Sequence, residues 1–378
     1  MSRAARRIGL IATAYVAAQV VGLGASGAQA RELIYGSWVS PKHGLNRLAL
    51  PHFFKGVEKA TKGEITWKLL AGGQLVSGRT TPQGIRDNMI DAGFGIAPYV
   101  PNRLPATNMI FSTYVFGGDI AAAAGAAMET VLLNCPACLA EHRRNNAIPL
   151  AGYDAAPFLL MCRDDVRGLA DLKGRKVRAS GAGVYLMRQA GATPVAMSPA
   201  QATTALQRGT IDCVHGAGNW IRAYGYGDIV KSVILHPTGI SGPAMALYFN
   251  RKTWKSLTPG QQAAHLAFAP AVIARSVMEM HYAETEEVLA DARKRGVRMH
   301  AGGAEFDRLI ARFKTGQRRR NIANARRFGV KSAEAIMAAF EAALVKWRGL
   351  SKGIGRDAAK FEAALKREIY DKVDHARF

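Results

Sequence analysis

The sequence lacks the signature motifs of the common enzyme classes. It contains no GxSxG nucleophile elbow, no HExxH zinc motif, no GxxxxGK[ST] phosphate loop and no GxGxxG at a strand–helix junction. The nearest match, Gly93-Phe94-Gly95, is missing the third glycine and the helix. Cysteine and histidine are too few at ligand spacing to predict a zinc site. These absences favour a protein that is not an enzyme, needs no metal or other cofactor, and binds a molecule without transforming it.

Long apolar runs are also scarce. After the first thirty residues, no segment is apolar over the ~20 residues that a transmembrane helix needs. The N-terminus has three arginines, an apolar stretch over 8–24 and the small-residue pattern Ala28-Gln29-Ala30. This order predicts a signal peptide, residues 1–30, cleaved after Ala30, with an uncleaved membrane anchor as the alternative. We expect the mature chain to be a soluble, exported protein.

Acidic residues are few beside basic ones. The 378 residues include 51 Lys and Arg against 28 Asp and Glu, a net charge of +23. Such a balance suits nucleic acid, an anionic membrane or an anionic ligand, and export argues against nucleic acid. The basic stretch 314–327 is most simply a solvated helix face; a partner-binding or membrane-binding surface is the alternative. Hydrophobic content of 49% is enough for two domains with cores.

Only four cysteines occur, at positions 135, 138, 162 and 213. In an exported protein they are candidates for disulfides, and three pairings are possible. Cys135-Pro136-Ala137-Cys138 resembles a redox motif, but it follows a helix-like run over 121–133 rather than a strand. We therefore expect structural pairing or burial.

Strand-like and helix-like segments alternate twice along the chain. The first series has strands at 33–38, 65–70 and 90–96 and helices at 48–61 and 81–88. The second has strands at 158–162, 175–179, 194–197 and 210–214, with helices at 184–189 and from Ser198 to Gly209. This alternation predicts two α/β units with mostly parallel sheets, at about 31–155 and 156–242.

A long helix follows the second unit. Thr258-Pro259-Gly260-Gln261 is a capping box, and helix-compatible sequence continues to Arg295, before Gly296. At 1.5 Å per residue this helix is roughly 50 Å long, enough to span both units, and Pro270 predicts a kink in it. From Ala304 onward the chain is helical and basic.

Arg178 is the strongest candidate for a binding residue. It ends the stretch Asp171-Leu172-Lys173-Gly174-Arg175-Lys176-Val177-Arg178 and should lie at the carboxyl end of a parallel strand, where open sheets bind ligands. A guanidinium holds a carboxylate through two parallel hydrogen bonds. The alternative is an arginine that points to water. Trp38 and Tyr99 are expected to face it from the first unit, with burial in the core as the alternative.

The loop after the strand at 210–214 is the second candidate. Gly216 allows the backbone to approach a ligand closely, and His215 or Asn219 can donate a hydrogen bond to it. Trp220 can form an apolar wall. The alternative is a loop that packs for structural reasons alone.

Several blocks in this order resemble the periplasmic substrate-binding proteins of TRAP (tripartite ATP-independent periplasmic) transporters, of the dicarboxylate-binding (DctP-like) type. They are Thr61-Lys62-Gly63, Gly73-Gln74-Leu75, Asp91, the 171–178 stretch, Gly191-Ala192-Thr193-Pro194-Val195, Ala205-Leu206-Gln207-Arg208-Gly209-Thr210-Ile211-Asp212, and Asn250 with Trp254 and Leu257. The resemblance implies two α/β lobes joined by crossing strands, a long kinked helix along both, and a hinge that closes on one ligand. It also implies that Arg178 grips the ligand's carboxylate and that the loaded, monomeric protein docks on a membrane permease.

Three positions differ from the sialic-acid-binding members of that family. Trp38 stands where they have a polar residue, Gly216 where they have an asparagine, and the region of Pro157 offers no second arginine. These differences imply a small keto-, hydroxy- or aromatic carboxylate. The first lobe is expected to comprise 31–155 and about 242–282, and the second 156–241 and about 283–378. A ligand sensor for a signalling receptor is the alternative function; an isomerase with His215 as its base ranks third.

Overall fold

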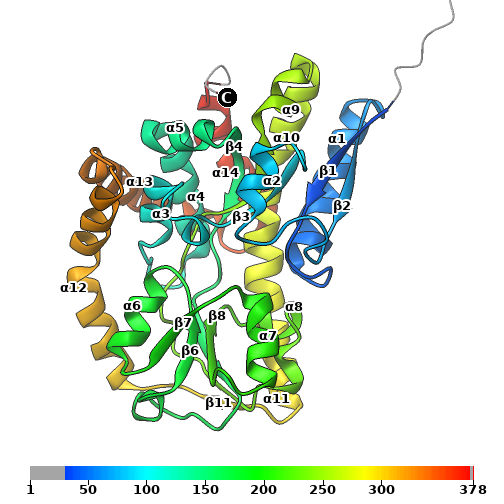
Figure 1. Ribbon diagram of the computed structural model, residues 1–378. Coiled ribbons are helices and arrows are strands. Elements are labelled where there is room, and N and C mark those ends of the chain that lie inside the picture. Colours follow the sequence, from blue (N-terminus) through cyan, green and yellow to red (C-terminus); the bar gives the residue numbers. More distant parts are fainter. Residues whose placement is uncertain (1–29, 375–377) are drawn as a thin grey trace, which may run out of the picture.

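Two mixed β-sheets, one above the other in Figure 1, form the framework of the protein. The structure, a computed structural model, describes residues 30–374 and 378. The predicted signal peptide, apart from Ala30, lies outside these residues. The upper sheet has the order β2-β1-β3-β10-β4 and the lower sheet β11-β9-β5-β8-β6-β7. The predicted two-lobed α/β fold is therefore confirmed.

The upper sheet combines four strands from residues 31–153 with one strand from beyond residue 240. Its strands are β1 (Arg31–Gly36), β2 (Ile65–Leu70), β3 (Ala92–Gly95), β4 (Ala147–Tyr153) and β10 (Ala244–Asn250). β1 runs parallel to β2 and β3, whereas β10 is antiparallel to β3 and β4. Its helices include α1 (Leu50–Ala60), α2 (Thr81–Arg86), α3 (Pro105–Phe111), α4 (Ile120–Glu129) and α5 (Pro136–Arg144). The late strand β10 ties residues beyond 240 back into this lobe.

The lower sheet includes the strand on which Arg178 lies. Its strands are β5 (Leu159–Cys162), β6 (Lys176–Ala179), β7 (Thr193–Ala196), β8 (Cys213–Gly216), β9 (Ser232–Ile234) and β11 (Arg298–His300). β6 is parallel to β7 and β8, while β5 is antiparallel to β8 and β9. The connecting helices are α6 (Ala182–Gln189), α7 (Pro199–Gln207) and α8 (Trp220–Ala223). Ser198 and Gln201 form the predicted capping box at the start of α7.

Two crossing segments pair with each other between the lobes. Ala155 donates its backbone N–H to the carbonyl of Ser241 at 3.0 Å, and Phe158 donates to Gly239 at 2.9 Å. The crossing connections are thus a short hydrogen-bonded ribbon between the lobes.

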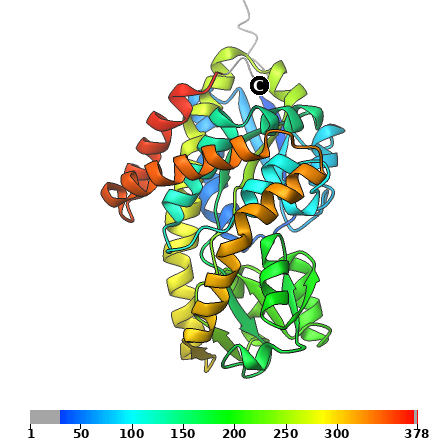
Figure 2. The same ribbon diagram turned by 90° about the vertical axis from the view of Figure 1, so that its left-hand side faces the viewer.

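One uninterrupted helical run connects the two lobes, as Figures 1 and 2 show in yellow. It consists of α10 (Pro259–Arg275), a π-helical segment η6 (Ser276–Ala283) and α11 (Glu284–Lys294). The predicted capping box of Thr258 and Gln261 starts it. Pro270 lies inside α10, and the helix changes from α to π geometry further on, at Ser276. α10 packs on the first-lobe helix α1, whereas α11 reaches α8 in the second lobe.

The C-terminal helices do not all belong to the second lobe. α12 (Ala304–Arg327) runs along the outside of both lobes and contacts α6 and α3. α13 (Ala333–Ile354) packs on α4, and α14 (Ala358–Glu368) on α10. Trp347 of α13 fills the space above Gly125, where a Cβ would lie 2.3 Å from its ring. The expectation that 283–378 joins the second lobe is therefore wrong for α13 and α14.

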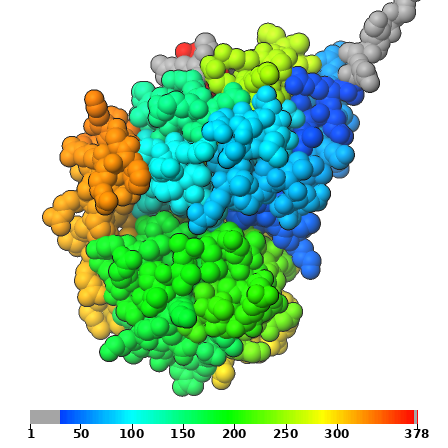
Figure 3. All heavy atoms as spheres, in the orientation of Figure 1, coloured from blue at the N-terminus to red at the C-terminus, as the bar shows by residue number. Residues whose placement is uncertain are grey.

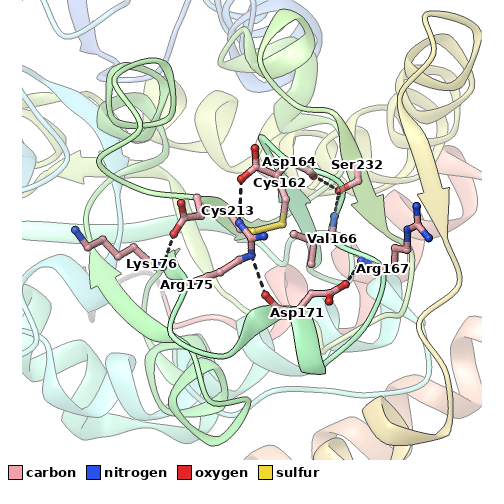
Figure 4. The surroundings of a disulfide bond; sticks show 10 residues. Cys162, Asp164, Val166, Arg167, Asp171, Arg175, Lys176, Cys213 and Ser232 are labelled. Carbon is pink, nitrogen blue, oxygen red and sulfur yellow. Dashed lines mark hydrogen bonds and ion pairs between the residues drawn. A yellow bond between two sulfur atoms is a disulfide. The ribbon is translucent and has the colours of Figure 1, made fainter.

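The disulfides are Cys135–Cys138 and Cys162–Cys213. Cys162 on β5 and Cys213 on β8 are register partners, so this bond clamps two neighbouring strands (Figure 4). The Cys135 sulfur accepts the Cys138 N–H at the start of α5. Both bonds are buried, in keeping with the expected structural role. Within the described part of the chain, no single helix is long and apolar enough to cross a membrane, although the bent pair Ile120–Asn134 and Pro136–Arg144 passes by length and composition alone.

Candidate functional site

A cavity lies where the two lobes meet, beneath the seam visible in Figure 3. Its wall is largely aromatic, built from Trp38, Phe94, Tyr99, Phe111, Tyr153, Phe158, Trp220 and Tyr224. Polar members of the wall include Arg178, Ser180, Ser241, His43 and His281. The space is about 50 Å³, room for a few water molecules. Side chains from both lobes enclose this space.

Arg178 enters this cavity from the carboxyl end of β6. The strand is parallel to β7 and β8, and Arg178 pairs in register with Val195 and Val214. Gly181, at φ +54°, then turns the chain into α6. This arrangement matches the strand-end position that the sequence predicts for Arg178.

The guanidinium of Arg178 is buried without an acidic partner. Its side chain is 1% exposed. It donates to the carbonyls of Met197 at 2.8 Å and His215 at 3.2 Å, and to the hydroxyls of Tyr99 at 3.4 Å and Ser180 at 3.3 Å. All four acceptors are neutral, and no carboxylate within residues 30–374 forms an ion pair with it. A buried charge is unfavourable unless an opposite charge compensates it, so the site is suited to an anion.

Trp38 and Tyr99 approach Arg178 from the first lobe. Trp38 stacks on Phe94 at 5.3 Å between ring centroids and donates its indole N–H to the Phe94 carbonyl. Tyr99 lies edge-on to Trp38 at 5.8 Å. Burial raises the pKa of Tyr99, which the cation of Arg178 partly offsets. Tyr99 is therefore a neutral phenol, and its contact with Arg178 joins the two lobes.

His215, Gly216 and Asn219 lie behind the wall instead of on it. His215 Nε2 is 2.6 Å from the Thr238 hydroxyl, and Asn219 donates to the Met280 carbonyl at 3.2 Å. None of the three is among the described residues that line the cavity. Burial and the charge of Arg178 lower the pKa of His215 to about 3, so its ring is neutral. The sequence led us to expect that His215 or Asn219 contacts a ligand directly, but in the structure both side chains lie behind the residues that line the cavity.

Gly216 nevertheless shapes the wall. A Cβ at this position would lie 2.0 Å from the ring of Trp220. The absence of a side chain lets that indole fold over β8, where the Arg178 guanidinium carbon lies 5.2 Å from its centroid. Gly216 therefore makes room for a cavity residue, which differs from the expected approach of its backbone to a ligand.

Sequence reasoning missed His43, Tyr153, Tyr224 and His281. Tyr153 ends β4, and His281 lies in the π-helical segment η6. Burial lowers the pKa of both His43 and His281 to about 3, so both are neutral. No local pattern distinguishes these residues from core residues. The one available signal is that Tyr153, like Arg178, lies at the end of a strand. Among residues 30–374, no cluster of three or more His, Cys, Asp or Glu is placed to hold a metal ion.

A family model described as bacterial extracellular solute-binding protein, family 7, matches residues 36–306. The fold is also similar to solved TRAP periplasmic solute-binding proteins. One from Bordetella bronchiseptica, with bound (R)- and (S)-mandelate, is 21% identical at a TM-score of 0.69, covering 84% of this chain and 99% of that one. One from Rhodoferax ferrireducens, with copurified benzoate, is 17% identical at a TM-score of 0.73, covering 85% and 99%. A marine metagenome protein in complex with metahydroxyphenylacetate is 18% identical at a TM-score of 0.74, covering 84% and 99%.

Proposed function

The chain belongs to family 7 of the bacterial extracellular solute-binding proteins, and on that basis we propose that it is the receptor of a TRAP transporter for a small organic carboxylate. The receptor captures the solute between its lobes and delivers it to the membrane permease. It acts outside the cytoplasm, as a periplasmic monomer whose signal peptide is removed after Ala30. It carries out no chemistry on the solute.

The single observation that carries this proposal is the unpaired charge of Arg178. The guanidinium is buried on the cavity wall and reaches only neutral acceptors. A carboxylate supplies the missing charge and accepts two parallel hydrogen bonds from the planar fork. Such a contact fixes both the position and the orientation of the ligand.

The rest of the wall defines the class of carboxylate. Arg178 is the one cation among the described residues on this wall, so a single carboxylate is compensated. Trp38, Tyr99 and Trp220 form part of an aromatic lining that suits a flat apolar body. We therefore favour an aromatic monocarboxylate over a sugar acid. The aromatic acids bound by the similar structures from Bordetella bronchiseptica and Rhodoferax ferrireducens support this choice.

His215, Gly216 and Asn219 act indirectly in this proposal. The His215 carbonyl holds Arg178, and Gly216 admits the Trp220 ring. Asn219 fixes the loop before α8 to the long helix through Met280. A ligand sensor for a signalling receptor would use the same site, and a sensor kinase gene beside this gene, in place of permease genes, would favour it.

A thermal-shift screen of organic acids tests the proposal. A ligand at a hundred times its dissociation constant stabilises the folded protein by ~2.7 kcal/mol. We expect aromatic monocarboxylates to raise the melting temperature of the mature protein and Arg178→Ala to abolish the rise. A protein stabilised by neutral sugars or amines, but by no carboxylate, would refute the role of Arg178.

A further inference from the structure

The buried imidazole of His281 has no hydrogen-bond partner among the described residues. Its side chain is 2% exposed, and both Nδ1 and Nε2 are shut off from solvent and unpaired. Buried polar groups in native proteins are nearly always paired, and each one left unpaired is unfavourable. Since both nitrogens are affected, packing alone does not account for a histidine at this position.

His281 lines the same cavity as Arg178. Aromatic rings separate the two along the wall, in the order Tyr153, Phe94, Trp38 and Tyr99. Successive centroids from His281 to Tyr99 are 5.2, 5.9, 5.3 and 5.8 Å apart, and the Tyr99 hydroxyl then accepts from Arg178. Because Arg178 and His281 both line this one cavity of about 50 Å³, a ligand anchored on Arg178 occupies the space that His281 borders.

The backbone around His281 is also unusual. The residue belongs to η6, the π-helical stretch Ser276–Ala283 inside the long helix. Segments of this kind are rare and occur frequently at functional sites. Met280, beside His281, accepts the hydrogen bond from Asn219 of the second lobe. The segment that carries His281 is thus fixed to the loop that precedes Trp220.

The chemistry of His281 selects a neutral partner. Burial, with a smaller contribution from His43, keeps the ring uncharged, so one nitrogen donates and the other accepts. The neighbouring His43 is not that partner: its Nδ1 accepts the backbone N–H of Leu45, and neither nitrogen of His281 is hydrogen-bonded to any described residue. A hydroxyl both donates and accepts, and it complements an uncharged imidazole, whereas a second carboxylate would meet no cation here.

We propose that His281 is a specificity-determining residue, whose imidazole hydrogen-bonds a ring hydroxyl of an aromatic monocarboxylate anchored on Arg178. The inference rests on the proposed function, because it requires a carboxylate at Arg178. It extends that function by defining the ligand class as hydroxylated aromatic acids.

Calorimetric titration of the mature protein with matched acids tests the assignment. The probes are benzoate against 3- and 4-hydroxybenzoate, and phenylacetate against 3-hydroxyphenylacetate. We expect a hydroxylated member to bind roughly tenfold more tightly than its parent. His281→Phe should remove that preference while changing the affinity for the parent acid less than about threefold. His281→Gln keeps a donor and an acceptor and should retain part of the preference. It provides a second test of the inference if His281→Phe does not fold.

His52→Phe is the matched control. His52 packs edge-on against Phe268 on the first lobe, away from the cavity, and the variant should leave both affinities unchanged. The inference is overturned if the wild-type protein binds the hydroxylated acid and its parent equally tightly in every pair. It is also overturned if His281→Phe weakens the binding of both acids to the same extent. If those acids still bind in an Arg178-dependent manner, only the His281 assignment falls. If no acid binds, or binding survives Arg178→Met, the proposed function falls with it.

Discussion

The guanidinium carbon of Arg178 lies 5.2 Å from the ring centroid of Trp220, and both side chains are buried. Arg178 comes from the end of β6, whereas Trp220 begins α8 after the turn that follows β8. The contact places a cation against the face of an indole, which attracts it but does not neutralise its charge. The pair therefore combines a charged anchor with an apolar surface, as an aromatic carboxylate requires.

Replacing Arg178 by methionine should separate binding from stability. The substitution removes a buried charge, which is stabilising, but leaves the Met197 and His215 carbonyls without a donor. These effects are of opposite sign, so we expect the free energy of unfolding without ligand to change by less than ~1 kcal/mol. Binding of aromatic acids should weaken at least ~100-fold, about 2.7 kcal/mol. Chemical denaturation and calorimetric titration measure the two quantities.

Arg222→Met is the control for this experiment. Arg222 is a partly exposed arginine of α8 that pairs with Glu287 at 2.8 Å, outside the cavity. Its loss should leave ligand affinity unchanged. A variant of Arg178 that loses stability and affinity in equal measure would instead indicate a structural role.

Gly216→Ala should disturb the cavity through Trp220. The added methyl group would lie 2.0 Å from the indole, so the ring must move. Overpacking of this kind typically destabilises by ~1–3 kcal/mol, and displacement of the wall should weaken binding about tenfold. Denaturation curves, ligand titration and the change in tryptophan fluorescence report the three effects.

Gly349→Ala provides a matched glycine control. Gly349 lies within α13, and nothing is within 4 Å of a Cβ placed there. Alanine in an open helical position stabilises by ~0.5–1 kcal/mol. Equal effects of the two substitutions would show that the crowding at Gly216 has no consequence for Trp220.

Local signals in the sequence were enough to predict much of the framework. The strand Ile65–Leu70 and the capping boxes at Ser198 and Thr258 occur where their residues predict them. Arg178 also lies at the expected strand end. In each case, a few consecutive residues determine the outcome, because caps and alternating strands depend on neighbours in the chain.

The remaining features depend on contacts between distant residues. His281 meets Tyr153 across 128 positions, and Trp347 reaches Glu129 across 218, so no local pattern reveals either contact. From the sequence, both ring nitrogens of His215 could hydrogen-bond a ligand, but in the folded chain its Nε2 is already paired with the Thr238 hydroxyl. Whether a polar side chain is available to a ligand depends on such partners, which only the folded chain supplies.

The buried carboxyl group of Asp154 should make stability depend on pH. Burial raises its pKa from the ordinary value of 3.8 to about 8, and its Oδ1 has no hydrogen-bond partner within the described chain. Between those two pH values the folded protein keeps a proton that the unfolded chain has released. The stability contributed by this group therefore falls as pH rises through that window.

Asp154→Asn should remove this part of the pH dependence. We expect the variant to gain stability relative to wild type by at least ~1.4 kcal/mol, the equivalent of one pKa unit, between pH ~4 and pH ~8. Denaturation at a series of pH values measures the difference in free energy of unfolding between the variant and wild type. The buried histidines are present in both proteins, so their contribution cancels in this difference. Asp228→Asn, at a side chain that is 97% exposed, should give a curve parallel to wild type. A parallel curve for Asp154→Asn would contradict the predicted protonation.

The two disulfides should differ in their contribution to stability, although all four sulfurs are buried. Cys162 and Cys213 are 51 positions apart, whereas Cys135 and Cys138 are separated by 3. Because a cross-link restricts the unfolded chain more when it closes a longer loop, the loop-entropy relation gives about 4 kcal/mol for the first bond and about 1.6 kcal/mol for the second. Replacing each pair by alanines and measuring denaturant unfolding tests this order.

The Cys162–Cys213 bond also joins β5, which follows the crossing segment at Phe158, to β8, which leads to Trp220 (Figure 4). Its removal should therefore weaken ligand binding as well, while loss of Cys135–Cys138 leaves affinity unchanged; the reverse order in either measurement would refute this division of roles.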